Sequence, residues 1–263
     1  MQLIRPSSVA GMFYPGEKDV LAHEVRALIN SARSNQLTPK ALIVPHAGYI
    51  YSGATAACAY AALTGTASKI RRVVLLGPTH RVSVRGLALP GANAFDTPLG
   101  RVQIDLSAVK IIENLPQVLV SSQAHAHEHS LEVQLPFLQT VLPDFKLLPL
   151  AVGMATAEEV AEVIELLWGG EETLIVISSD LSHYLPYEIA RQKDESTVQC
   201  VLNESLLTSF DQACGAIPIN GMILAARKHN LSVHLLDQRN SGDTAGSKEG
   251  VVGYASFAFT QPD

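Results

Sequence analysis

The chain has few charged residues and no run of basic ones. Of its 263 residues, 17% are charged and 47% are hydrophobic, and the formal net charge is −6. A nucleic-acid interface needs clustered lysine and arginine, so we expect no nucleic-acid partner. The large hydrophobic share predicts a folded core rather than a disordered chain.

Long apolar runs and closely spaced cysteines are also missing. No stretch reaches the roughly 18 apolar residues of a membrane span, and no apolar segment of about 7–15 residues follows a basic start. We therefore expect a cytoplasmic protein without a membrane partner. Cys58, Cys200 and Cys214 lie far apart with no C-x-x-C pair, so we expect none of them to be catalytic or metal-bound.

Three common catalytic motifs are absent as well. The sequence contains no G-x-S-x-G, no P-loop and no G-x-G-x-x-G. A serine hydrolase of that type, a P-loop nucleotidase and a dinucleotide-binding enzyme therefore lack the residues that they need.

A short β-forming apolar run followed directly by a histidine or an aspartate occurs three times. The runs at 41–44, 72–76 and 173–177 lead to His46, to His80, and to Asp180 with His183. The carboxyl ends of parallel strands form the ligand-binding edge of an α/β sheet. We therefore predict that these four side chains meet at one site.

The order of the predicted elements indicates the fold class. Strands alternate with helices, which predicts an α/β fold: a single-domain sandwich over residues 1–263, with a mostly parallel central sheet flanked by helices. Turn residues and alternating hydrophobicity at 86–104 predict short antiparallel strands or a hairpin beside the sheet. Predicted helices cover about 17–34, 107–114, 156–168 and 218–229, and residues 187–210 are predicted to form one long helix or a broken pair.

His46 and His80 are candidate metal ligands because they follow two strands at equivalent positions. Two imidazoles and one carboxylate form the metal site of non-haem iron oxygenases. Asp243, in the turn Asn240–Thr244, is the best carboxylate to complete such a set. The alternatives are that the histidines only cap strand ends and that Asp243 only stabilises a turn.

The turn at 178–183 carries a second candidate pair. A carboxylate three residues before a histidine could orient the ring, which would make Asp180 and His183 catalytic residues with His183 as general acid or base. The alternative is that Ser179 or Asp180 caps a helix whose first turn contains His183.

Three histidines alternate at positions 125, 127 and 129, but their spacing is not the H-E-x-x-H of zinc peptidases. We expect His125 and His127 to lie in a solvated loop. A helix that starts near Glu128 would group Glu128 with His129. Glu128, His129 and Tyr49 are the candidate substrate-binding residues.

Six blocks of this sequence, in order, resemble the Memo proteins, also called protein B of the AmmeMemoRadiSam system. The blocks are V-A-G-M-F-Y-P at 9–15, V-P-H-A-G-Y-I-Y-S-G at 44–53, L-G-P-T-H at 76–80, E-H-S-L-E-V-Q-L-P at 128–136, S-S-D-L-S-H at 178–183 and N-S-G-D-T at 240–244. The resemblance covers nearly the whole chain. It implies the fold of the class III extradiol dioxygenases and a metal crevice.

Carried over from the family, His46 and His80 match the metal histidines, with Asp180 and His183 beside them. The resemblance leads us to expect the third ligand near position 244, as a cysteine in the animal members. This chain offers Asp243 or Thr244 there. Loss of a soft thiolate would favour iron(II) over zinc or copper.

The resemblance implies a metal-dependent oxidoreductase that uses iron(II) on a diol-like small molecule. A metal-dependent hydrolase would use the same ligands around a metal-bound water. A third hypothesis is a non-catalytic module that binds a peptide or protein, for example the radical-SAM protein and other members of the AmmeMemoRadiSam system.

Overall fold

Four parallel strands form the centre of the structure, a computed structural model that describes residues 3–32 and 37–262. The strands lie in the order β2 (Pro39–Val44), β9 (Thr173–Ser178), β3 (Arg72–Pro78) and β8 (Lys146–Val152). They are rich in valine, leucine and isoleucine and are buried on both faces, as strands of a covered parallel sheet are. The predicted α/β fold is confirmed.

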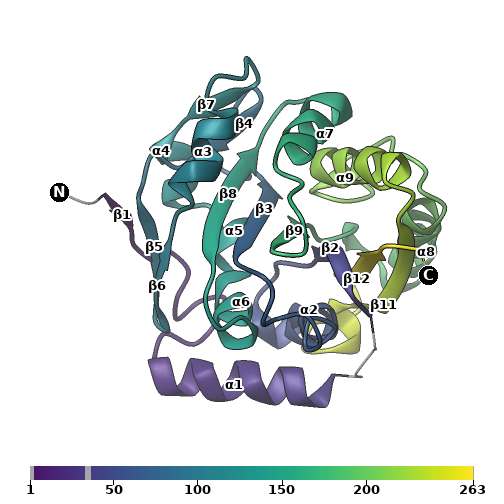
Figure 1. Ribbon diagram of the computed structural model, residues 1–263. Helices are drawn as coiled ribbons and strands as arrows, with labels where there is room; N and C mark the ends of the chain where they lie inside the picture. Colours follow the sequence, from purple (N-terminus) through teal and green to yellow (C-terminus); the bar gives the residue numbers. More distant parts are fainter. Residues whose placement is uncertain (1–2, 33–36, 263) are drawn as a thin grey trace.

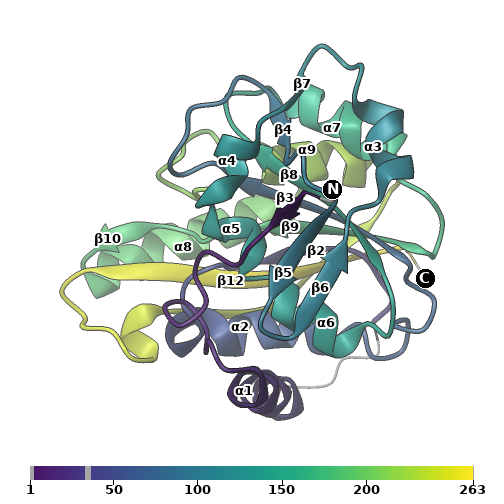
Figure 2. The same ribbon diagram turned by 90° about the vertical axis from the view of Figure 1, so that its left-hand side faces the viewer.

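Antiparallel strands extend the sheet on both sides. On one side, β12 (Val251–Thr260) pairs with β2, with β10 (His183–Leu185) and, along its other edge, with β11 (Ser232–Asn240). On the other side, β4 (Leu87–Leu89) is antiparallel to β8 and parallel to β7 (Val118–Val120). Figure 2 shows how far β12 runs beyond β2 toward β10. The parallel strands are therefore concentrated at the centre.

Helices cover both faces of the sheet (Figure 1). One face packs against α1 (Lys18–Ser31), α2 (Tyr49–Ala61) and α6 (Leu135–Val141), the other against α3 (Leu106–Ile112), α7 (Ala157–Leu166), α8 (Tyr187–Leu202) and α9 (Ala216–Lys228). Successive strand residues point to opposite faces, so Leu42 joins one core and Ile43 the other. The sandwich thus has two separate apolar layers. The predicted helix end at 33–34 lies outside the described residues.

The predicted hairpin beside the sheet is present. Strands β5 (Ala94–Thr97) and β6 (Gly100–Gln103) are antiparallel, and β1 (Ile4–Arg5) adds to β5 in parallel. Two short helices follow β7, namely α4 (Ser122–Ala126) and α5 (His129–Glu132). They lead the chain from the edge of the sheet back to the ends of the central strands.

The helix predicted over 187–210 ends earlier, at Leu202. Glu204 has a φ of 54°, and the N–H groups of Glu204 and Ser205 donate to the carbonyls of Val201 and Cys200. This pair of hydrogen bonds is a Schellman motif, which terminates a helix. Neither the single long helix nor the broken pair of helices predicted for 187–210 forms, because residues 203–215 contain no helix. This irregular segment passes through Cys214 before α9 begins. In the described part of the chain, no helix combines the length and the apolar character needed to cross a membrane.

Candidate metal site

The site lies at the carboxyl edge of the central strands. His46 follows β2 by two residues, His80 follows β3 by two, and Asp180 follows β9 by two. Because Val44 pairs with Ser178 in the parallel register, the residues two positions further on are neighbours. The ends of β2 and β9 therefore meet, as predicted, because of this register.

Three imidazoles form a cluster at this edge. His46, His80 and His129 each offer a ring nitrogen within 4.8 Å of the others, and their ring centroids are 4.6–5.3 Å apart. Two nitrogens bound to one ion at about 2.1 Å are separated by at most about 4.2 Å. Small side-chain movements would therefore let the three rings share a metal. His129 is the first residue of α5, and Phe13 covers it at a centroid distance of 4.7 Å.

A hydroxyl group fixes the tautomer of His46. The Ser178 Oγ–H donates to the Ser130 carbonyl at 2.6 Å, and Oγ also accepts from Gln134 Nε2 at 2.8 Å. The only hydrogen of this hydroxyl is thus used, so His46 Nδ1, at 2.9 Å, must donate to Oγ. The lone pair of His46 is consequently on Nε2, on the other side of the ring.

The buried carboxylate of Glu128 fixes the tautomer of His80. The Nδ1–H of His80 donates to Glu128 Oε1 at 2.8 Å, and the backbone N–H donates to Oε2 at 2.6 Å. Burial alone would raise the pKa of Glu128, but these bonds and that from Ser130 N–H lower it to about 2. Glu128 is 2% exposed and is therefore placed to orient His80 and not to line open space.

Burial keeps two of the three imidazoles, His46 and His129, neutral at neutral pH. It lowers the pKa of His46 well below its usual value, with the neighbouring histidines adding to the effect. Burial also lowers the pKa of His129 to about 4, against the opposing charge of Glu128. Metal ions bind the neutral form of imidazole, so at neutral pH no proton has to leave these two rings.

A cysteine that sequence reasoning set aside contacts the cluster. Cys214 Sγ lies 3.4 Å from His46 Nε2, and the Asp180 N–H points to the same sulfur at 3.3 Å. This thiol comes from the α8–α9 loop and not from near Thr244, and the expectation that no cysteine is catalytic or metal-bound stays a prediction. Burial raises the pKa of Cys214 to about 12, so the free side chain is a thiol. In the sequence, the position of Cys214 is marked by little more than the glycine that follows it, Gly215, which directly precedes α9.

Asp180 lies at the site, but its carboxylate binds the backbone of His46 and not a side chain. Its Oδ1 accepts from the His46 backbone N–H at 2.7 Å. Burial raises the pKa of Asp180 to about 7, although this hydrogen bond opposes the shift. The carboxylate therefore positions the segment that carries His46, and its position next to that residue follows from the β2–β9 register.

His183 lies at the start of β10 and is partly buried. Burial lowers its pKa, and charge on His80 would lower it further. A neutral imidazole at neutral pH can accept a proton. This placement is compatible with the predicted acid–base role.

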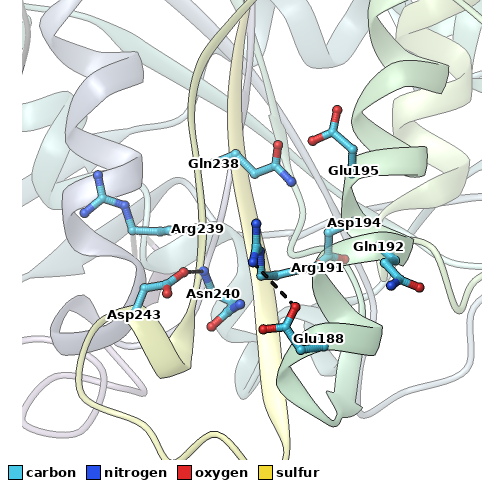
Figure 3. A pocket seen from close by; sticks show the side chains of 9 residues that line it. All are labelled: Glu188, Arg191, Gln192, Asp194, Glu195, Gln238, Arg239, Asn240 and Asp243. Carbon is cyan, nitrogen blue, oxygen red and sulfur yellow. Dashed lines mark hydrogen bonds and ion pairs between the residues drawn. The ribbon is translucent and has the colours of Figure 1, made fainter.

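Asp243 lies in a different part of the molecule from the candidate ligand set. Its two oxygens accept from the Tyr187 hydroxyl and from the Asn240 backbone N–H, within a short 3₁₀ turn (Ser241–Asp243). Figure 3 shows it beside Arg239, lining a groove of about 670 Å³ between β11 and α8. None of the three clustered histidines lines that groove. Among the described residues, the cluster that could hold a metal ion consists of His46, His80 and His129 and does not include Asp243.

Two further residues differ from their expected positions. Tyr49 is buried in the core beside Phe137, and its hydroxyl donates to the Val133 carbonyl at 2.8 Å. His125, expected in a solvated loop, is 1% exposed and its Nε2–H donates to the Ala88 carbonyl. His127 is exposed, as expected.

The fold and the site together define an α/β sandwich whose parallel strand ends gather three imidazoles that could hold a metal ion, with a thiol in contact with one of them. A sequence profile described as Memo-like protein matches residues 5–258. A MEMO1 family protein of Aquifex aeolicus is 37% identical over 97% of this chain and 99% of its own length. Another from Methanosarcina barkeri is 35% identical with the same coverage. The chain belongs to the Memo family.

A solved structure shares the fold. The crystal structure of the uncharacterized protein JW3007 from Escherichia coli K12 matches with a TM-score of 0.50 at 13% identity. The match covers 82% of this chain and 98% of that one.

Proposed function

We propose that this chain is a metal-dependent oxidoreductase of the extradiol dioxygenase type, with a divalent metal held by His46, His80 and His129. The observation that carries the proposal is a set of three clustered ring nitrogens, with two of the rings held as Nδ1–H tautomers by groups behind them. A bound iron(II) would supply Lewis-acid polarisation of a diol-like substrate and redox chemistry with dioxygen.

The residues of the chain itself would bind, orient and move a proton. Ser178 and Glu128 hold two rings in position, and Asp180 fixes the backbone at His46. His183, uncharged at neutral pH because burial lowers its pKa, would accept the proton of a substrate hydroxyl.

The donor set bears on the choice of metal. Imidazoles suit iron, zinc and copper, and thiol ligands shift the preference toward softer ions. Because Cys214 is within contact distance of His46, the supposed loss of a thiol no longer argues for iron. We retain iron(II) in the proposal because oxygen chemistry needs a redox-active ion, and zinc serves as the comparison.

The test is anaerobic purification, loading with iron(II), and measurement of bound metal and of oxygen uptake with a panel of catechols. We expect one metal per chain and uptake that is lost in His46→Ala. His127→Ala is the matched control, because this histidine lies in the same stretch as His129 but is exposed.

Three outcomes would count against the proposal. Substoichiometric metal in the wild type, or His46→Ala that binds metal like the wild type, would remove the metal site. Ester hydrolysis by the zinc-loaded protein without oxygen uptake would favour the hydrolase instead. Stoichiometric metal without turnover of either kind would favour a binding module of the AmmeMemoRadiSam system.

A further inference from the structure

A second cavity, of about 380 Å³, opens next to the histidine cluster. It lies between the segment after β3, the end of β8 and the loop that leads into α9. Both His80 and Cys214 are part of its wall. A molecule in this cavity would therefore have one end at the candidate metal ligands.

Part of the cavity wall is apolar. Met154 and Phe210, which line the cavity, are each 65% exposed, and Ile217, Pro218 and Val84 complete this part of the wall. Large apolar side chains that gather at a cavity and remain exposed mark a binding surface for an apolar group.

The cavity also contains one cation without a counter-ion. Arg81 is the only lining residue with a permanent charge, and no residue in the described ranges forms an ion pair or a hydrogen bond with its guanidinium. Arg85, four residues on, is instead held by both carboxylate oxygens of Glu159, at 2.8 and 2.9 Å. Arg81 directly follows His80 in the chain and both residues line the cavity, so Arg81 lies on the side of the cavity next to the cluster.

We propose that this cavity binds the substrate, and that the substrate is an amphipathic organic monoanion. Arg81 would hold its carboxylate near the histidines, with the diol oxygens of the proposed function at the same end of the molecule and its apolar body lying against Met154 and Phe210. Guanidinium groups prefer carboxylates because they donate two parallel hydrogen bonds. The assignment rests on the proposed function, since it names the substrate class of the same metal site.

The test measures binding of three probes to the full-length chain, both after chelation and after zinc loading. Hydrocinnamate carries the anion and the apolar body, hydrocinnamamide is its neutral counterpart, and propionate lacks the ring. Ligand-observed NMR titration gives the dissociation constants. The variants are Arg81→Gln and Phe210→Ala, and Arg85→Gln is the matched control because Arg85 does not line the cavity.

We expect wild type and Arg85→Gln to bind hydrocinnamate about tenfold more tightly than the amide, the effect of one charge-assisted contact. In Arg81→Gln this preference should fall to about one. Phe210→Ala should weaken both aromatic probes about fivefold and leave their ratio unchanged. Propionate should bind more weakly than hydrocinnamate in the wild type.

Equal affinity for acid and amide, or the same preference in Arg81→Gln, would overturn the assignment. Its failure can be separated from failure of the metal site. Arg81-dependent binding to a chain that takes up no metal would support the cavity and remove the proposed function. Stoichiometric metal with no anion preference would remove the assignment of the cavity alone.

A cobalt(II)-loaded sample tests the orientation. The paramagnetic ion should broaden the methylene protons next to the carboxylate more than the ring protons. The reverse order would show the ligand in the opposite direction and overturn the placement of the anion at Arg81.

Discussion

Glu132 connects the N-terminal segment to the helix that carries His129, and its replacement is the most informative test of the fold around the site. Its side chain is fully buried. The carboxylate accepts hydrogen bonds from Arg5 Nη1, from the Ser8 N–H and Oγ–H, from the Val9 N–H and from the Tyr14 hydroxyl, at 2.5–3.0 Å. Glu132→Gln keeps the shape but removes the charge and puts an NH₂ among donors.

The expected cost follows from these contacts. Removing one partner of a buried ion pair costs about 3–5 kcal/mol, because the other charge stays buried without compensation. Arg5 is 6% exposed, but it also donates to the His125 and Glu128 carbonyls at 2.6 and 2.8 Å. Because these two carbonyls still accept hydrogen bonds from Arg5, the cost should lie at the low end of this range. We expect the free energy of unfolding to fall by about 3 kcal/mol.

The assay is urea unfolding at neutral pH, followed by circular dichroism. The matched control is Glu171→Gln, whose exposed ion pair with Lys69 should contribute less than about 1 kcal/mol. Hydrogen exchange adds a local measurement, since the Val9 amide loses its acceptor in Glu132→Gln and should exchange faster. If Glu132→Gln were as stable as Glu171→Gln, the account of Glu132 as the anchor of this segment would be wrong.

Three further predictions concern the site and its surroundings. Glu128→Gln removes the charge and leaves one acceptor oxygen for the two N–H donors of His80, so zinc affinity measured against a chromophoric chelator should fall about 10–100-fold; an unchanged affinity would contradict this. Asp243→Asn should leave zinc affinity unchanged, and a loss would return Asp243 to the ligand set. Burial lowers the pKa of His125 from 6.5 to about 4, so between these values the unfolded chain binds more protons and stability falls as pH falls. His125→Gln should therefore lose about 3 kcal/mol less than wild type between pH 7 and pH 4 in denaturant unfolding, and equal losses would refute the argument.

The convergence of the strand ends could be predicted because local pattern and sheet topology give the same answer. Apolar runs of β-forming residues end two residues before His46, His80 and Asp180, and parallel strands bring such ends to one edge. The partner of each side chain could not be predicted in this way. Asp180 was expected to act on His183, three residues away, but the β2–β9 register places it against the backbone of His46.

The thiol was missed for a related reason. Cys214 reaches the cluster only because α8 ends in a Schellman motif at Glu204, after which a loop of irregular backbone approaches His46. The prediction of one long helix or a broken pair up to residue 210 did not include this irregular loop. Likewise, Asp243 was chosen because it follows a predicted strand and lies where the resemblance places the third ligand, although Asn-x-x-Asp is equally suited to the turn in which it caps Asn240.

The supporting hydrogen bonds explain why these histidines are more than core residues. Ser178 and Glu128 both contact the Nδ1 side, so the Nε2 lone pairs of His46 and His80 lie on the opposite side of each ring. Burying polar groups costs free energy, and apolar side chains could fill the same volume without a network behind them. The cost is explained if the Nε2 lone pairs of His46 and His80 bind a ligand such as a metal ion. The same geometry implies that losing the Nδ1 partner should affect metal affinity more than the stability of the fold.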